Sequence, residues 1–193
     1  MSSCHSPSTL RTVQRAASRV RLPDGSVVIV RRIHRSDSAL LLEHFDHLGD
    51  ESRYRRFLAP VNHLTSDQVE YFTRPDHRRH EALFALDDSE HPVGVARYIS
   101  SSDDPTTAEI AAAVVDGWQG RGVGNELLNR LARAAREQGI QRFTALMLED
   151  NSPMRRLLAK LGPVEILNRD AGNVEVAVNL DKCTRGPEMA VRR

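Results

Sequence analysis

One carboxylate stands inside an apolar stretch of the chain. Glu109 is the only charged residue from Ala108 to Val115, where every other residue is alanine, isoleucine or valine. A carboxylate on a buried strand is costly unless it faces a cleft, finds partners or takes up a proton. Desolvation would also make it a stronger base, able to accept the proton of a cationic amine directly or through water. Glu109 is therefore our candidate general base; the alternative is a structural carboxylate at a strand end, paired with an arginine.

A glycine-rich turn follows this stretch. Its glycines let the backbone approach an anion closely, and the free N–H groups and positive dipole end of a following helix favour phosphate there. Arg121 adds a positive side chain. The turn lacks the Lys-Ser/Thr pair of a Walker loop, and Leu127 stands where the dinucleotide fingerprint has its third glycine. The pattern predicts a phosphate site of another class, or a tight turn with a structural role only. The glycines are Gly120, Gly122 and Gly124.

The pattern around these residues predicts two successive strand–helix units. The strand Ala108–Val115 leads into a helix from Gly122 to Gln138, which has apolar residues on one face and ends at Gly139. A strand from Phe143 to Leu148 precedes a helix from Ser152 to Leu161. Asn151 begins that last helix, where its simplest role is N-capping.

The rest of the chain predicts antiparallel strands and short helices. Asp24-Gly25 is a hairpin signal before a strand at Val27–Val30. Runs at Ala82–Leu86 and Val93–Ile99 indicate a second hairpin, and a third closes the chain at 164–167 and 174–180. Helices are expected from a Ser36 cap to Leu48, over 51–57, and after the capping box Thr65-Ser-Asp-Gln68. The fold class is therefore α+β, with a mixed, mainly antiparallel central sheet flanked by helices.

Length and composition limit the range of functions. The 193 residues suit one domain, expected over 20–181, between a disordered basic arm at 1–19 and a flexible tail at 182–193. A net charge of +1 gives no reason to expect a nucleic acid partner, and no stretch is long and apolar enough for a membrane span. Cys4 and Cys183 lie far apart, so no metal site is expected. We expect a cytoplasmic protein; an organelle transit peptide is the alternative for the arginine-rich N-terminus.

The motifs together resemble the GNAT acetyltransferase superfamily. Gln119-Gly-Arg-Gly-Val-Gly124 matches its coenzyme A pyrophosphate loop, Q/R-x-x-G-x-G/A, and follows the fourth predicted strand as in that family. Asn151-Ser-Pro-Met154 and 157–162 are similar to its N-x-x-M-x-x-L-x-x-K-L-G segment. Within the superfamily the chain looks most like bacterial protein lysine acetyltransferase catalytic domains, which have runs similar to Leu22-Pro-Asp-Gly25, Glu51-Ser-Arg-Tyr-Arg-Arg-Phe57 and Ala108-Glu-Ile-Ala.

This resemblance implies an acetyl-CoA-dependent N-acetyltransferase in which an amine attacks the bound thioester directly in a ternary complex. The amine would belong to a lysine side chain of a protein, Glu109 would be the base, and acetyl-CoA would be a co-substrate with no metal needed. A backbone N–H at a bulge near the strand end, at Val115 or its neighbour, would bind the developing oxyanion. Asn151 would contact the pantetheine arm. The pyrophosphate would lie on Gln119, Gly120, Arg121, Gly122, Val123 and Gly124.

One departure from the family and two alternative functions accompany this interpretation. Leu158 stands where many members have a tyrosine that protonates the leaving thiolate, so water or Ser152 would take that role. The first alternative is a small-molecule acetyltransferase acting on a polyamine, an amino acid derivative or an antibiotic amine. The second is a non-catalytic regulator that binds acyl-CoA. A carboxylate at position 109 is evidence against this second alternative.

Overall fold

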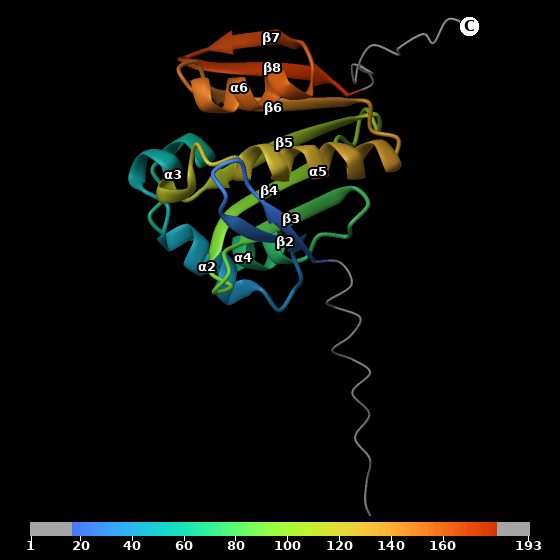
Figure 1. The fold of residues 1–193 in the computed structure, drawn as a ribbon. Helices are drawn as coiled ribbons and strands as arrows, with labels where there is room; N and C mark the ends of the chain where they lie inside the picture. The colour runs from blue at the N-terminus through green and yellow to red at the C-terminus, as the bar shows by residue number, and fades with distance from the viewer. Residues whose placement is uncertain (1–16, 181–193) are drawn as a thin grey trace, which may run out of the picture.

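A single mixed sheet organises the molecule. The structure, a computed structural model, describes residues 17–180, so the expected tail and nearly all of the expected arm lie outside the described residues. Eight strands follow the order β1-β2-β3-β4-β5-β6-β8-β7. All neighbours pair antiparallel except β5 and β6, which are parallel. This arrangement confirms the expected fold class (Figure 1). The strands are β1 (Ser18–Arg21), β2 (Val27–Arg32), β3 (His80–Leu86), β4 (Pro92–Ser100), β5 (Thr107–Val114), β6 (Arg142–Leu148), β7 (Val164–Asp170) and β8 (Asn173–Asn179).

Helices cover both faces of the sheet. Helices α5 (Val123–Glu137) and α6 (Ser152–Leu161) supply most of the leucines of the larger core, among them Leu127 and Leu131. Helices α2 (Ser38–Asp46) and α4 (Ser66–Thr73) pack on the other face, where Leu41 and Phe45 join Phe84 in a second core. The short helix α3 (Asp50–Phe57) contacts both β5 and β6, and a 3-10 turn, η2 (Asp116–Trp118), follows β5. The site described below lies where α3 meets these two strands.

Local sequence signals explain most element ends, with a few corrections. The predicted capping box is present: Thr65 accepts from the Gln68 N–H, and Gln68 accepts from the Thr65 N–H. The expected Ser36 cap is wrong, because Asp37 is the N-cap of α2. The Asp37 carboxylate instead binds the Arg31 guanidinium through two contacts of 2.6 and 3.0 Å and accepts from the His34 N–H. Helix α2 ends at Asp46 rather than Leu48, and β1 starts at Ser18, two residues before the expected domain boundary.

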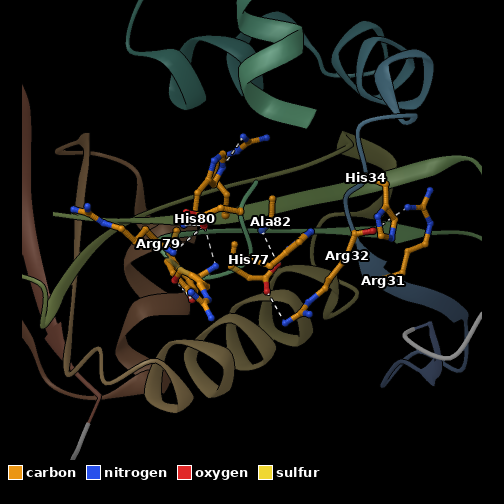
Figure 2. A network of polar contacts seen from close by, with 12 residues as sticks. Arg31, Arg32, His34, His77, Arg79, His80 and Ala82 are labelled. Carbon is orange, nitrogen blue, oxygen red and sulfur yellow. Dashed lines mark hydrogen bonds and ion pairs between the residues drawn. The ribbon is translucent and has the colours of Figure 1, made fainter. Parts of the chain in front are cut away.

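A buried carboxylate joins β3 to β2 and to the preceding loop. Glu81 is 1% exposed. Its Oε1 lies 2.7 Å from His77 Nδ1 and accepts from the Ala82 N–H at 3.0 Å, while Oε2 pairs with Arg32 Nη2 at 2.9 Å. Figure 2 shows Arg32 and His77 reaching this centre from two different elements. A buried carboxylate with three such partners is fully satisfied, so it fixes the beginning of β3.

Helix α2 also has a buried histidine. His44 is 3% exposed, and burial lowers its pKa to about 4 from 6.5. Between these two pH values the unfolded chain binds a proton at this position that the folded chain does not bind. The free energy of unfolding therefore falls as the pH falls through this window.

We predict that His44→Leu removes part of this pH dependence. The histidine should cost the wild-type protein about 2 kcal/mol of unfolding free energy at pH 5 relative to neutral pH. Burial also lowers the pKa of His80 to about 4, so the variant keeps a second contribution of the same sign. Urea denaturation across this pH range measures the slope, and an identical slope in His44→Leu and wild type would contradict the prediction.

Candidate active site

The site is a cleft that opens where two parallel strands separate. Strands β5 and β6 pair only over Thr107–Glu109 and Arg142–Thr144. Beyond this point they diverge, and a cleft of about 770 Å³ lies between residues 110–114 of β5 and 145–147 of β6. This volume is typical of small-molecule sites. Residues of α3, of the loop after β5 and of α6 complete its walls.

Glu109 lies at the closed end of this cleft. It is the last residue of β5 that pairs with β6, opposite Thr144. Its side chain lines the cleft and is exposed, so the expected desolvation is wrong. Within residues 17–180 the carboxylate has no hydrogen bond and no ion pair, and so the alternative of a structural pair with an arginine is also wrong. The carboxylate is free to accept a proton from a group in the cleft.

The open edge of β5 offers backbone donors, but Val115 is not among them. The Val115 N–H donates to the Val93 carbonyl at 3.0 Å on the β4 side, and the pairing of β4 with β5 shows no bulge there. Because backbone groups alternate in direction along a strand, those of Ala112 and Val114 point toward the diverging β6. The expected Val115 donor and bulge are therefore wrong, and of the two expected positions only the neighbouring Val114 has its N–H on the side of the cleft.

The glycine-rich turn forms the wall next to this edge. Gly120 and Gly122 line the cleft with φ of +74° and +107°, a left-handed backbone that favours glycine. Gly122 is the N-cap of α5, so the first N–H groups of that helix lie at the cleft. Gly124 also lines the cleft, and a Cβ there would press on Leu157. The turn thus has the form that the sequence predicts for an anion site.

Two residues of this motif point elsewhere. The Arg121 guanidinium stacks on the Trp118 ring at 4.8 Å and lies 3.8 Å from an Asp24 carboxylate oxygen, and the residue does not line the cleft. The Val123 side chain is buried in the larger core. In this arrangement neither side chain lines the cleft.

Asn151 and the far wall of the cleft come from the second strand–helix unit. Asn151 lines the cleft, and its Oδ1 accepts from the Met154 N–H at 3.1 Å, so the expected N-cap of α6 is present. Arg156 and Lys160 line the same wall, one helical turn apart. Sequence reasoning missed these two cations, although their i, i+4 spacing after Asn151 is visible in the sequence.

A polar clip joins α3 to the loop after β5. The Ser52 hydroxyl donates to Asp116 Oδ1 at 2.5 Å. Gln119 Nε2 donates to this same carboxylate oxygen at 3.0 Å, to Ser52 Oγ at 3.0 Å and to the Val114 carbonyl at 3.1 Å. Gly49 makes room for the carboxylate, because a Cβ there would overlap Asp116 Oδ2. The side chain of Gln119 therefore holds the two walls of the cleft together, a role that the sequence did not indicate.

Comparison with known proteins identifies this architecture. Residues 45–162 match the model of the Acetyltransferase (GNAT) family. The chain belongs to the GNAT acetyltransferase family. As a member of this family it is an acyltransferase whose acetyl donor is acetyl-CoA.

Three GNAT relatives show how far the likeness extends. The chain is 35% identical over 133 residues to the acetyltransferase Pat of Mycolicibacterium smegmatis, which covers 68% of this chain but only 39% of Pat. The structure of the GNAT domain of S. lividans PAT superposes with a TM-score of 0.78 at 31% identity, covering 85% of this chain and 97% of that one. The structure of yncA from Salmonella typhimurium with its cofactor acetyl-CoA shares the fold alone, with a TM-score of 0.64 at 19% identity over 84% of this chain and 98% of that one.

Two positions are relevant to the acid that protonates the leaving thiolate, and neither lies in the cleft of this GNAT domain. Leu158 is 1% exposed within the larger core. Ser152 is exposed but does not line the cleft, and its hydroxyl accepts from Arg156 Nη1 at 3.1 Å. The expected role of Ser152 as a proton donor is therefore without geometric support.

In residues 17–180 no helix could span a membrane and no group of three potential ligand side chains could hold a metal.

We predict that Ser52→Ala opens the clip. Hydrogen bonds to a charged carboxylate stabilise more than neutral ones, so backbone amides of α3 and of residues 116–122 should exchange with solvent deuterium about tenfold faster. Ser52→Thr keeps the hydroxyl and is the matched control. Equal exchange in the alanine and threonine variants would show that the clip does not hold these segments.

Proposed function

We propose that this GNAT enzyme transfers the acetyl group of acetyl-CoA to the side-chain amine of protein lysines, by direct attack in a ternary complex. The observation that carries the proposal is the unpaired Glu109 carboxylate at the closed end of a cleft whose open end is bounded by the glycine-rich turn. A base and a phosphate site at opposite ends of one cleft match a substrate with a reactive thioester at one end and phosphates at the other. The similarity to Pat supports a protein lysine as acceptor.

The walls of the cleft suit coenzyme A along its length. The turn and the N-terminus of α5 would take the pyrophosphate, and the cations Arg156 and Lys160 lie on the opposite wall for further phosphate charge. The free backbone groups of Ala112 can pair with an amide of an extended pantetheine arm, as an added strand pairs with a sheet edge. At Val114 the carbonyl already accepts from Gln119 Nε2, which leaves the N–H for the thioester oxygen. Asn151 would contact this arm through its side-chain amide while its Oδ1 caps α6.

The transfer step then needs few groups from the protein. Glu109 accepts a proton from the acceptor ammonium, directly or through water, and the neutral amine attacks the thioester carbonyl carbon. The Val114 N–H stabilises the negative charge that develops on the carbonyl oxygen. The carbon–sulfur bond breaks and the thiolate leaves. A thiol has a reference pKa of about 8.5, so water suffices to protonate it.

The acceptor class can be tested directly. The purified chain is incubated with acetyl-CoA and a cell lysate, and in parallel with a panel of polyamines, amino acid derivatives and antibiotic amines. Thiol release reports transfer, and an antibody against acetyl-lysine reports modified proteins. Acetylated proteins support the proposal. Thiol release with free amines alone would identify a small-molecule enzyme instead.

Gly120 gives a clean test of the phosphate site. A Cβ at this position meets no atom within 4 Å, and asparagine and aspartate tolerate a positive φ better than most residues. Gly120→Asp should weaken coenzyme A binding at least about tenfold through charge repulsion, whereas the isosteric Gly120→Asn should bind far more tightly than the aspartate variant. Calorimetry measures both affinities. Equal coenzyme A affinity of the two variants would show that the pyrophosphate does not bind at this turn.

Glu109→Gln tests the base. It keeps the shape of the side chain and removes the basic site, so turnover should fall by roughly 10²–10⁴ while acetyl-CoA affinity stays close to wild type. The deficit should shrink at high pH, because the lysine amine, with a reference pKa of about 10.4, loses its proton there unaided. Steady-state rates from neutral pH upward measure both effects. Full activity of the variant at neutral pH would exclude Glu109 as the base.

A further inference from the structure

One arginine in the cleft has no hydrogen-bond or ion-pair partner among the described residues. Arg56 of α3 lines the cleft together with Glu109. Its neighbours on the helix are engaged: Arg53 donates to the carbonyls of Phe45 and Asp46, and Arg55 pairs with Glu51 at 2.5 Å. Within residues 17–180 the Arg56 guanidinium has no hydrogen bond and no ion pair, and its only described contacts of this kind are with aromatic rings.

The surroundings of Arg56 carry excess positive charge. Its guanidinium lies 5.0 Å from the Phe57 ring centre and 6.0 Å from that of Phe72, and the Arg97 guanidinium lies 4.2 Å from the same Phe72 ring. Arg97 is 3% exposed, its Nε has no hydrogen bond, and it forms no ion pair within the described chain. Its Nη1 donates to the Phe72 carbonyl at 3.4 Å and lies 3.3 Å from His80 Nε2, and both of these partners are uncharged near pH 7.

Nearby histidines do not add to this charge, and one carboxylate offsets part of it. Burial lowers the pKa values of His44 and His80 to about 4, so both are neutral near pH 7. Burial also lowers the pKa of Arg56, and the negative charge of Glu109 opposes that effect. Glu109 thus acts on Arg56 without forming an ion pair, and Arg97 has no ion-pair partner within residues 17–180, so the positive charge of these two arginines is not compensated by any ion pair there. The other unpaired carboxylate of the cleft, that of Asp116, is bound by Ser52 and Gln119 instead.

We propose that Arg56 forms an anion subsite that binds a carboxylate of the acceptor, close to the amine that Glu109 deprotonates. This inference rests on the proposed function, because it assigns the Glu109 end of the cleft to the acceptor. Arg56 and Glu109 are not within 4.0 Å of each other as an ion pair, so each remains available to a different charge of the acceptor. An acceptor with both charges satisfies both groups, whereas one with only an ammonium leaves Arg56 unpaired.

Two sources can supply this carboxylate. In a protein acceptor it is an aspartate or glutamate side chain close to the lysine, and in a small molecule it is the carboxylate of an amino acid. The chemistry is the same in both cases, since guanidinium binds carboxylate through charge-assisted hydrogen bonds. The experiment therefore has one arm for each source.

The peptide arm uses a library with one central lysine, blocked ends and random residues on both sides. After limited transfer from acetyl-CoA, mass spectrometry gives the enrichment of Glu over Gln and of Asp over Asn at each flanking position. We expect enrichment of about tenfold at one or more positions in the wild type, and its loss in Arg56→Gln. Arg56→Lys retains the charge and should keep part of the preference. Each enrichment is a ratio within one variant, so a general loss of stability does not alter it.

The small-molecule arm compares 6-aminohexanoate with its amide as acceptors, or as ligands of the enzyme–coenzyme A complex if no transfer occurs. A carboxylate preference in either arm that depends on Arg56 supports the inference. Equal use or equal binding of charged and uncharged acceptors by the wild type in both arms overturns it, as does a preference that persists in Arg56→Gln. Failure of the proposed function is seen separately, as the absence of acetyl-lysine on proteins in the lysate assay.

Discussion

The early end of the β5–β6 pairing is the constraint on which the site depends. Parallel strands normally continue their ladder, because an unpaired backbone group away from water costs about as much as a lost hydrogen bond. Here the ladder stops at Glu109 and Thr144, although β5 runs on to Val114 and β6 to Leu148. The backbone N–H and C=O groups of β5 and β6 that remain unpaired beyond this point are the donors and acceptors that line the cleft. The same break in the sheet creates the space for the substrate and the polar edge that can bind it.

A sheet opened in this way needs other contacts to hold its walls at a fixed spacing. On the β5 side these are the hydrogen bonds of Ser52, Asp116 and Gln119, which join α3 to the loop and cover the Val114 carbonyl. On the β6 side Asn151 caps α6, and Leu157 of that helix packs against Gly124 at the start of α5. The glycine turn is thus held from both sides. Its positive φ values place the helix N-terminus at the cleft without a ligand having to order it.

The sequence predicts the parts of this arrangement that depend on local signals. Strand and helix periodicity predict β5 and α5, and the capping box predicts the start of α4. Asp37 and Val115 show where local signals fail. The Asp37 carboxylate is held by Arg31, six residues away on another element, and Val115 is excluded because the two-residue alternation of a strand turns its N–H toward β4. The clip and the unpaired Arg56 depend on which elements meet in space, which no local pattern encodes.

The exposure of Glu109 changes the physical account of the base. An apolar strand predicts that desolvation strengthens the carboxylate, but the side chain is exposed and has no partner within residues 17–180. As the proposed base it would then act through its position: it stands where the strands separate, beside the backbone edge that would hold the thioester. A base held next to the reacting amine removes the cost of bringing the two together, and this holds even when its intrinsic strength is ordinary. The absence of a tyrosine at position 158 fits the same account, since a thiol leaves without a strong acid. The proposed reaction thus depends less on the acid or base strength of individual side chains than on the positions that the opened sheet gives to the reacting groups.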